Sequence, residues 1–153
     1  IGFTVAEPGI IKAMGALQGQ MTSNICSFAM AAIKTALENH DDDVERMRVQ
    51  FEKRGQLIHQ LLTDIPGIKC PAPTGAFYVF PDVSAFFGKT DGAGKVLNTA
   101  QELATSLLEQ GGVAVVPGEG FEAPNHVRLS FATDDDSIKN GVARIKEFLT
   151  NLK

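Results

Sequence analysis

The sequence predicts an α+β fold, a two-layer α/β sandwich in which helices pack on one face of a small sheet. Apolar residues recur at helical spacing over residues 44–65 and again after residue 133. Between these stretches, residues 126–132 alternate between apolar and polar side chains, as half-buried strands do. From residue 41 the expected element order is α-β-β-α-β-β-α, which is typical of an α+β domain.

Composition and charge argue against several classes of protein. The 153 residues are 44% hydrophobic and 21% charged, as in globular domains, and carry a net charge of −4. Without a basic stripe, a long apolar segment or a signal segment, we expect neither nucleic acid nor membrane as a partner. Cys26 and Cys70 suit neither a disulfide framework nor a metal site, so we expect a reduced, cytoplasmic setting without a bound metal.

Residues 1–40 do not fit the α+β unit and are expected to be parts of a different domain. Residues 1–6 have the apolar character of a strand, and Pro8 suits the first turn of a short helix. The polar stretch Gln18–Asn24 contains a glycine and predicts a loop.

Thr22, Ser23 and Asn24 precede an alanine-rich helix that should run to about Glu38. One of the three is expected to cap that helix, which is apolar on several sides and should be buried between other elements. The alternative is that their hydroxyls and free N–H groups bind an anion at the helix start.

The predicted long helix begins near Asp41–Asp43, where negative charge favours a helix N-terminus. Pro66-Gly67 ends it. Its apolar stripe consists of Val44, Met47, Phe51, Ile58, Leu61 and Ile65.

The remaining elements are shorter. Strands are expected at Ile68–Cys70, Ala76–Phe80, Val113–Val116 (of the buried type) and His126–Ala132, with a flexible loop over residues 88–94. One helix is expected at about Val96–Gln110, with Leu103 and Leu107 facing inward, and a last helix is capped by Thr133. Gly118-Glu119-Gly120 predicts a tight turn.

Arg128 is the side chain of greatest chemical interest. It lies on the polar face of an alternating strand, where an arginine can form a bidentate pair with a carboxylate. Taken alone, a solvent-facing arginine is the stronger interpretation, because alternation already explains its position. His40, His59 and His126 share no metal-ligand spacing, and no Ser-His-Asp or Cys-His arrangement is legible.

Several segments, taken together in chain order, resemble the C-terminal part of class I aminotransferases. These segments are IGFTVAE (1–7), IIKAM (10–14), QMTSN (20–24), PTGAFYVFPD (73–82), GVAVVPG (112–118) and HVRLSFAT (126–133). The sequence looks most like the bacterial aspartate aminotransferase branch. Each motif alone is weak, but the ordered set covers nearly the whole chain.

The resemblance implies a fold type I enzyme that uses pyridoxal 5′-phosphate (PLP) and works as a homodimer. It implies that residues 1–40 are a remnant of the large PLP-binding domain and an interdomain helix, and that residues 41–153 form the C-terminal small domain. The implied substrates are amino acids and 2-oxo acids, with the amino group passing from aspartate or a similar amino acid to 2-oxoglutarate.

The resemblance also assigns residues. Arg128 matches the arginine that holds the substrate α-carboxylate, and Phe77 matches a residue lining the substrate side. Thr22, Ser23 and Asn24 match a loop that reaches the cofactor phosphate of the partner subunit.

No catalytic residue is assigned within the chain, because the family's Schiff-base lysine precedes the segment that matches Ile1. The chain by itself is therefore expected to be an inactive fragment that does not hold PLP covalently. Residues 1–40 are expected to show disorder, self-association or strand exchange. The alternative is a free-standing α+β module that binds carboxylates without catalysis.

Overall fold

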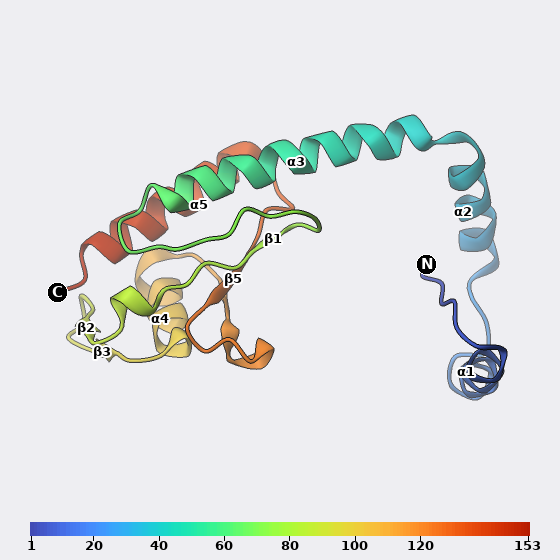
Figure 1. Cartoon of the computed structure of the whole chain (residues 1–153), viewed down its shortest axis with the longest axis horizontal. Helices are drawn as coiled ribbons and strands as arrows, with labels where there is room; N and C mark the ends of the chain where they lie inside the picture. The colour runs from blue at the N-terminus through green and yellow to red at the C-terminus, as the bar shows by residue number, and fades with distance from the viewer. The chain divides into compact units, whose positions relative to one another are not determined.

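A computed structural model describes residues 1–153, and the chain divides into two compact units, Ile1–Met47 and Arg48–Lys153 (Figure 1). Each unit is considered by itself. None of the helices combines the length and the apolar character needed to cross a membrane.

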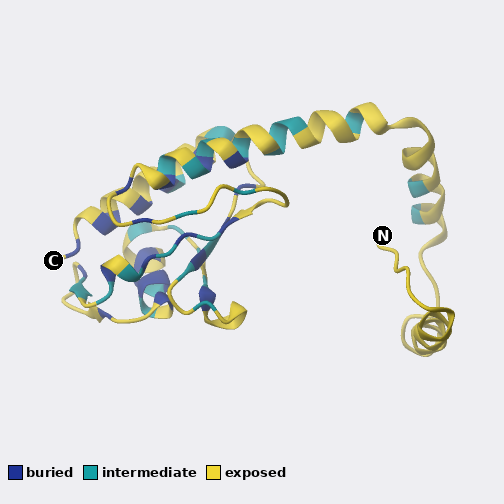
Figure 2. Cartoon of the chain, in the orientation of Figure 1, coloured by how far each residue is buried: buried dark blue, intermediate teal, exposed yellow.

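The first unit contains helices but no strand and no buried residue (Figure 2). Helix α1 spans Pro8–Met21 and helix α2 spans Ser27–Asn39. The strand predicted over residues 1–6 is wrong, because these residues pair with no other segment and a strand needs such pairing. The loop predicted over Gln18–Asn24 is wrong in its first part, since α1 continues to Met21.

Helix α2 differs from its prediction in burial and in its cap. It was expected to be buried, yet none of its residues is, because no other element of its unit covers its apolar sides. Its N-cap is Cys26, which forms no side-chain cap hydrogen bond, so the predicted cap by Thr22, Ser23 or Asn24 is wrong.

Helix α3 spans Asp41–Thr63 and carries the predicted acidic first turn. Within the second unit it buries Gly55, Ile58 and Leu62, whereas Val44 and Met47 of the predicted stripe are exposed. The glycine permits a close approach, since a Cβ at residue 55 would lie 3.2 Å from Pro73 Cγ and 3.3 Å from Phe131 Cζ.

A three-stranded antiparallel sheet of order β1-β5-β4 occupies the second unit, with β1 at Tyr78–Val79, β4 at Val116–Pro117 and β5 at Val127–Ser130. The predicted alternation of β5 is confirmed, because Val127 and Leu129 are buried while Arg128 is half-buried and Ser130 is exposed. The buried strand predicted at Val113–Val116 is wrong, since it contains no buried residue.

Two other strand predictions change. The predicted strand Ile68–Cys70 contributes only one bridge, between Lys69 and Asp82. Part of the predicted loop over residues 88–94 instead pairs in a small hairpin of β2 (Lys89–Thr90) with β3 (Val96–Leu97).

Helices α3, α4 and α5 share one core with the sheet. Helix α4 spans Ala100–Ser106 and continues as a π-helical turn, Leu107–Gly111, that ends at Gly112 with a φ of 64°. Helix α5 spans Asp135–Thr150. The core includes Ile58, Leu62, Val79, Leu97, Leu103, Leu107, Val127, Leu129, Phe131, Ile138, Val142, Ile145 and Leu149.

The N-cap of α5 is Asp134, one residue after the predicted Thr133. Its Oδ1 accepts a hydrogen bond from Ser137 N at 2.8 Å, because a carboxylate satisfies the first free N–H groups of a helix. Hydrogen bonds from the Ser137 hydroxyl and backbone lower the pKa of Asp134 to about 2.

A buried carboxylate fastens the β2–β3 hairpin to α4 and its π-helical turn. Asp91 Oδ1 accepts hydrogen bonds from the backbone N–H groups of Ala93 and Lys95, each at 2.9 Å. Asp91 Oδ2 accepts hydrogen bonds from the Ser106 hydroxyl at 2.6 Å and from Gln110 Nε2 at 2.8 Å. The Ser106 hydroxyl is the largest cause of the lowered pKa of Asp91.

We therefore expect Asp91→Asn to lower the free energy of unfolding at neutral pH. A lowered folded-state pKa stabilises the fold above the unfolded pKa of about 3.9, and this contribution is lost as the pH falls through the folded pKa. The difference between wild type and Asp91→Asn in chemical denaturation should hence shrink below about pH 4. Asp64→Asn is the control, because the exposed Asp64 side chain makes no hydrogen bond or ion pair. A pH-independent difference would contradict this expectation.

Candidate functional site

Arg128 lies on the face of the sheet opposite the core. Its neighbours on β5, Val127 and Leu129, point into the core, so the pleat directs Arg128 outward. Ser130 has the same parity on β5 as Arg128, and Tyr78 pairs with Ser130, so both side chains also lie on the outer face. Tyr78 is thereby the diagonal neighbour of Arg128 on β1.

The Arg128 guanidinium lies between two aromatic rings. Its Cζ atom is 4.4 Å from the centroid of the Tyr78 ring and 4.6 Å from that of Phe121. It forms no hydrogen bond or ion pair within the chain. Two rings therefore contact the guanidinium, while its N–H groups stay available to a ligand. The edge of a guanidinium suits a carboxylate, which can accept two parallel hydrogen bonds from it.

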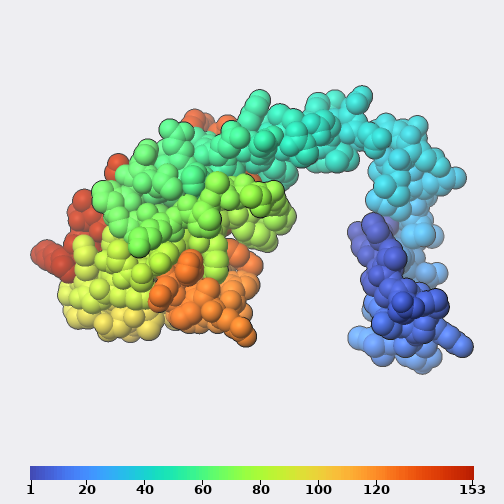
Figure 3. Space-filling view, in the orientation of Figure 1, coloured from blue at the N-terminus to red at the C-terminus, as the bar shows by residue number.

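A tightly closed loop carries Phe121. It begins with the 3₁₀ turn Gly118–Phe121, which agrees with the predicted tight turn, and it lies on the surface of the second unit (orange in Figure 3). Gly118 N donates to His126 O at 2.8 Å, and Ala123 N donates to Gly118 O at 3.0 Å. No larger residue fits at position 118, because a Cβ there would lie 2.1 Å from Ala123 O and 2.6 Å from His126 O.

Further ring contacts support the loop from below. Phe80 meets Phe121 edge to face, with centroids 5.9 Å apart, and stacks on His126 at 5.1 Å. His126 Nδ1 is buried without a hydrogen-bond partner. Phe80 directly follows the edge strand β1, so its packing connects the loop to that edge of the sheet.

Phe77, the other substrate-lining candidate, lies one ring away from Arg128. Its centroid is 4.4 Å from that of Tyr78 and 6.2 Å from that of Phe51 on α3. It lines a groove of about 630 Å³ together with Phe51, Phe131 and the preceding residues 73–76. Ala76 has a φ of 55°, a left-handed conformation that is unusual for a residue with a Cβ.

Thr22, Ser23 and Asn24 lie in the first unit, where they terminate α1. The N–H groups of Thr22 and Ser23 both donate to Gln18 O, and that of Asn24 donates to Thr22 O. The free N–H groups expected here are thus already used within the chain. The exposed hydroxyls of Thr22 and Ser23 make no hydrogen bond and remain available as donors to an anion.

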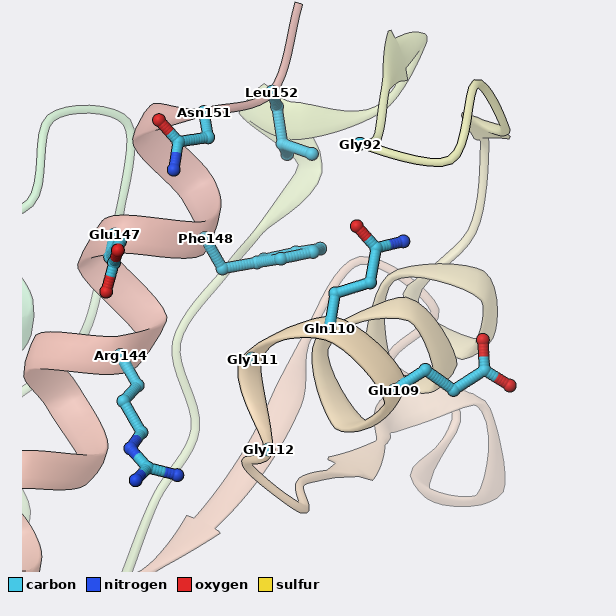
Figure 4. A pocket seen from close by; sticks show the side chains of 10 residues that line it. All are labelled: Gly92, Glu109, Gln110, Gly111, Gly112, Arg144, Glu147, Phe148, Asn151 and Leu152. Atoms are coloured by element: carbon cyan, nitrogen blue, oxygen red, sulfur yellow. The ribbon is translucent and has the colours of Figure 1, made fainter.

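A second cavity of about 540 Å³ opens between α5 and the π-helical turn (Figure 4). Phe148 reaches from α5 toward Gln110 in this view, and the lining also includes Arg144, Glu109 and Glu147. The lining contains charged side chains of both signs. Arg128 and its neighbours on the outer face of the sheet do not contribute to it. The outer face of the sheet is accordingly the better candidate site.

Residues 1–145 match the sequence model of the family described as aminotransferase class I and II. The chain belongs to this family. An aspartate/prephenate aminotransferase of Cereibacter sphaeroides is 39% identical over 152 residues, which are 99% of this chain and 38% of the relative. The chain thus spans little more than a third of the length of that relative.

Solved aminotransferase structures share the fold. The aspartate aminotransferase from Rhizobium meliloti aligns with a TM-score of 0.89 and 34% identity, covering 95% of this chain and 36% of that one. The aspartate aminotransferase from Thermus thermophilus with maleate aligns with a TM-score of 0.78 and 34% identity, covering 92% of this chain and 34% of that one. The chain is therefore α+β and shares, over its own length, the fold of these solved aminotransferases.

Two residues beside Arg128 were not found from the sequence. Tyr78 has the outward parity of its strand, but the register between β1 and β5 was needed to place it beside Arg128. Phe121 follows a predicted turn, and only the closure of that turn brings its ring over the guanidinium.

We expect Gly118→Ala to lower the free energy of unfolding by about 3 kcal/mol, because the added methyl group collides with two backbone oxygens. Gly120→Ala is the matched control in the same turn, where a Cβ meets nothing within 4 Å, and should change stability by at most about 0.5 kcal/mol. Urea denaturation of both variants measures the difference. Equal stability of the two would show that the loop closure is not as tight as described.

Proposed function

We propose that this chain is the C-terminal part of a PLP-dependent aminotransferase that transfers the amino group of aspartate or a similar amino acid to 2-oxoglutarate. The observation that carries the proposal is the Arg128 guanidinium, which contacts the rings of Tyr78 and Phe121 and has no hydrogen-bond or ion-pair partner in the chain. Family membership and relatives named as aspartate aminotransferases support it.

Arg128 is the carboxylate-binding residue in this proposal. Two parallel N–H···O bonds from its edge fix both the position and the plane of the substrate α-carboxylate. Because the substrate is held in one orientation, the loss of its orientational entropy occurs on binding and no longer adds to the barrier of the chemical step. Phe77 lines the substrate side in the adjoining groove, where its ring extends the apolar wall.

PLP, when bound, supplies the electron sink for breaking the bond at the substrate α-carbon. The residues of this chain that fit it are Thr22, Ser23 and Asn24, through their side chains alone, since their N–H groups are used internally. Thr22 and Ser23 hydroxyls, with the Asn24 amide nitrogen, suit the phosphate oxygens of the cofactor of a partner subunit. The whole protein is accordingly proposed to be a homodimer.

We assign residues 1–40 to the large PLP-binding domain and interdomain helix, and residues 41–153 to the small domain. The exposed apolar side chains of the first unit support this assignment, because such surface ordinarily marks contact with other protein. They include Phe3, Val5, Leu17, Met21 and Phe28.

The second candidate function is a carboxylate-binding module without catalysis. The unit Arg48–Lys153 favours it in one respect, because that unit holds its own core together with Arg128, Tyr78 and Phe121. Turnover by the longer protein, measured with PLP present, separates the two functions.

Arg128→Gln should weaken maleate binding to the chain at least about tenfold, because charge-assisted hydrogen bonds are lost. Isothermal titration or NMR titration measures the affinity. Arg144→Gln is the control, since Arg144 is exposed in the other cavity. Equal maleate affinity in wild type and Arg128→Gln would refute the assignment of Arg128.

The 153-residue chain alone should show no transamination between aspartate and 2-oxoglutarate when PLP is added, because the resemblance places the Schiff-base lysine before Ile1. A coupled assay for oxaloacetate checks this, and turnover above the blank would contradict it.

The same chain should self-associate through residues 1–40, and Phe3→Asp with Phe28→Asp should shift its size-exclusion elution toward the monomer. A wild-type chain that elutes as a monomer would contradict this expectation.

A further inference from the structure

The two rings over Arg128 come from separate elements, and each is held in place independently of the arginine. Tyr78 is paired in the sheet with Ser130, and its ring contacts Phe77. Phe121 rests on Phe80 and is carried by the loop that Gly118 closes. The guanidinium therefore enters a slot whose walls exist without it.

We propose that Tyr78 and Phe121 are positioning residues that make the Arg128 site selective for planar carboxylates over tetrahedral oxyanions. This inference rests on the proposed function of Arg128 as a carboxylate-binding residue. The two rings hold the guanidinium plane, and the plane decides which shape of anion fits its edge.

The selectivity follows from the geometry of the two kinds of anion. A carboxylate lies in the guanidinium plane and places both oxygens on its edge. A phosphate that uses two oxygens in the same way directs its remaining oxygens above and below that plane, toward the rings. Apolar rings offer these charged oxygens no hydrogen bond and displace water that would otherwise solvate them, which costs free energy.

The same rings strengthen the orientation of Arg128. An arginine side chain loses rotamer freedom when it binds, and a side chain already held between two rings has less to lose. Losing one ring frees the side chain, and ordering it again on binding costs about fivefold in affinity. Removing one ring should thus weaken carboxylate binding and relax the selectivity by about that factor.

The test is an NMR titration of the complete chain with maleate and, separately, with inorganic phosphate. The probe is the Arg128 Nε–Hε resonance, which is assigned by its absence from Arg128→Gln. In the wild type the rings should shift this resonance upfield, and maleate should bind more tightly than phosphate.

Phe121→Leu keeps an apolar side chain at a residue that is 46% exposed, so the fold should be retained. It should lose the upfield shift, bind maleate about fivefold more weakly, and reduce the preference for maleate over phosphate by about fivefold. Phe121→Tyr keeps a ring at this position and should retain all three wild-type properties. Phe3→Leu, which changes an exposed phenylalanine of the first unit, is the control and should match wild type.

The outcomes separate this inference from the proposed function. If Arg128→Gln loses maleate binding but Phe121→Leu keeps the wild-type shift and selectivity, the positioning role is overturned while the function stands. If Arg128→Gln binds maleate as the wild type does, the proposed function fails. A wild-type Arg128 resonance without an upfield shift, whatever its affinity for maleate, overturns the inference as well.

Discussion

The pairing of β5 with strands on both sides is the constraint on which the candidate site depends. β5 is the central strand of the sheet, antiparallel to β1 and to β4, so its side-chain alternation is fixed by two registers. Val127 and Leu129 are committed to the core by that register, and a slip of one residue would expose both. The outward direction of Arg128 is therefore secured by apolar burial on the opposite face.

The two units of the chain differ in how far they bury their apolar residues. The second unit gathers helices and sheet around one core, whereas the first buries no residue at all. Helices α1 and α2 are thus held by their backbone hydrogen bonds and little tertiary packing, a marginal arrangement for helices of this length. This contrast supports the proposed assignment of residues 1–40 and 41–153 to different domains, although the compact units divide slightly later, after Met47.

Local patterns in the sequence were sufficient for the elements of the second unit whose burial is periodic. The long helix, the last helix and the alternation around Arg128 follow from spacing alone. The strand expected at residues 1–6 failed because apolar residues form a strand only when another strand accepts their hydrogen bonds. The position of Phe121 was inaccessible for a related reason, since its contact with Arg128 depends on loop closure between residues eight apart.

The closed loop gives the two walls of the arginine slot unequal freedom to change over evolutionary time. Tyr78 is tied into the sheet, so replacing it disturbs strand pairing as well as the slot. Phe121 stands on a surface loop that is closed by its own backbone hydrogen bonds, and its replacement leaves the core untouched. Residue 121 is accordingly the position at which descendants of this sequence can drift toward other ligands while the fold stays as it is.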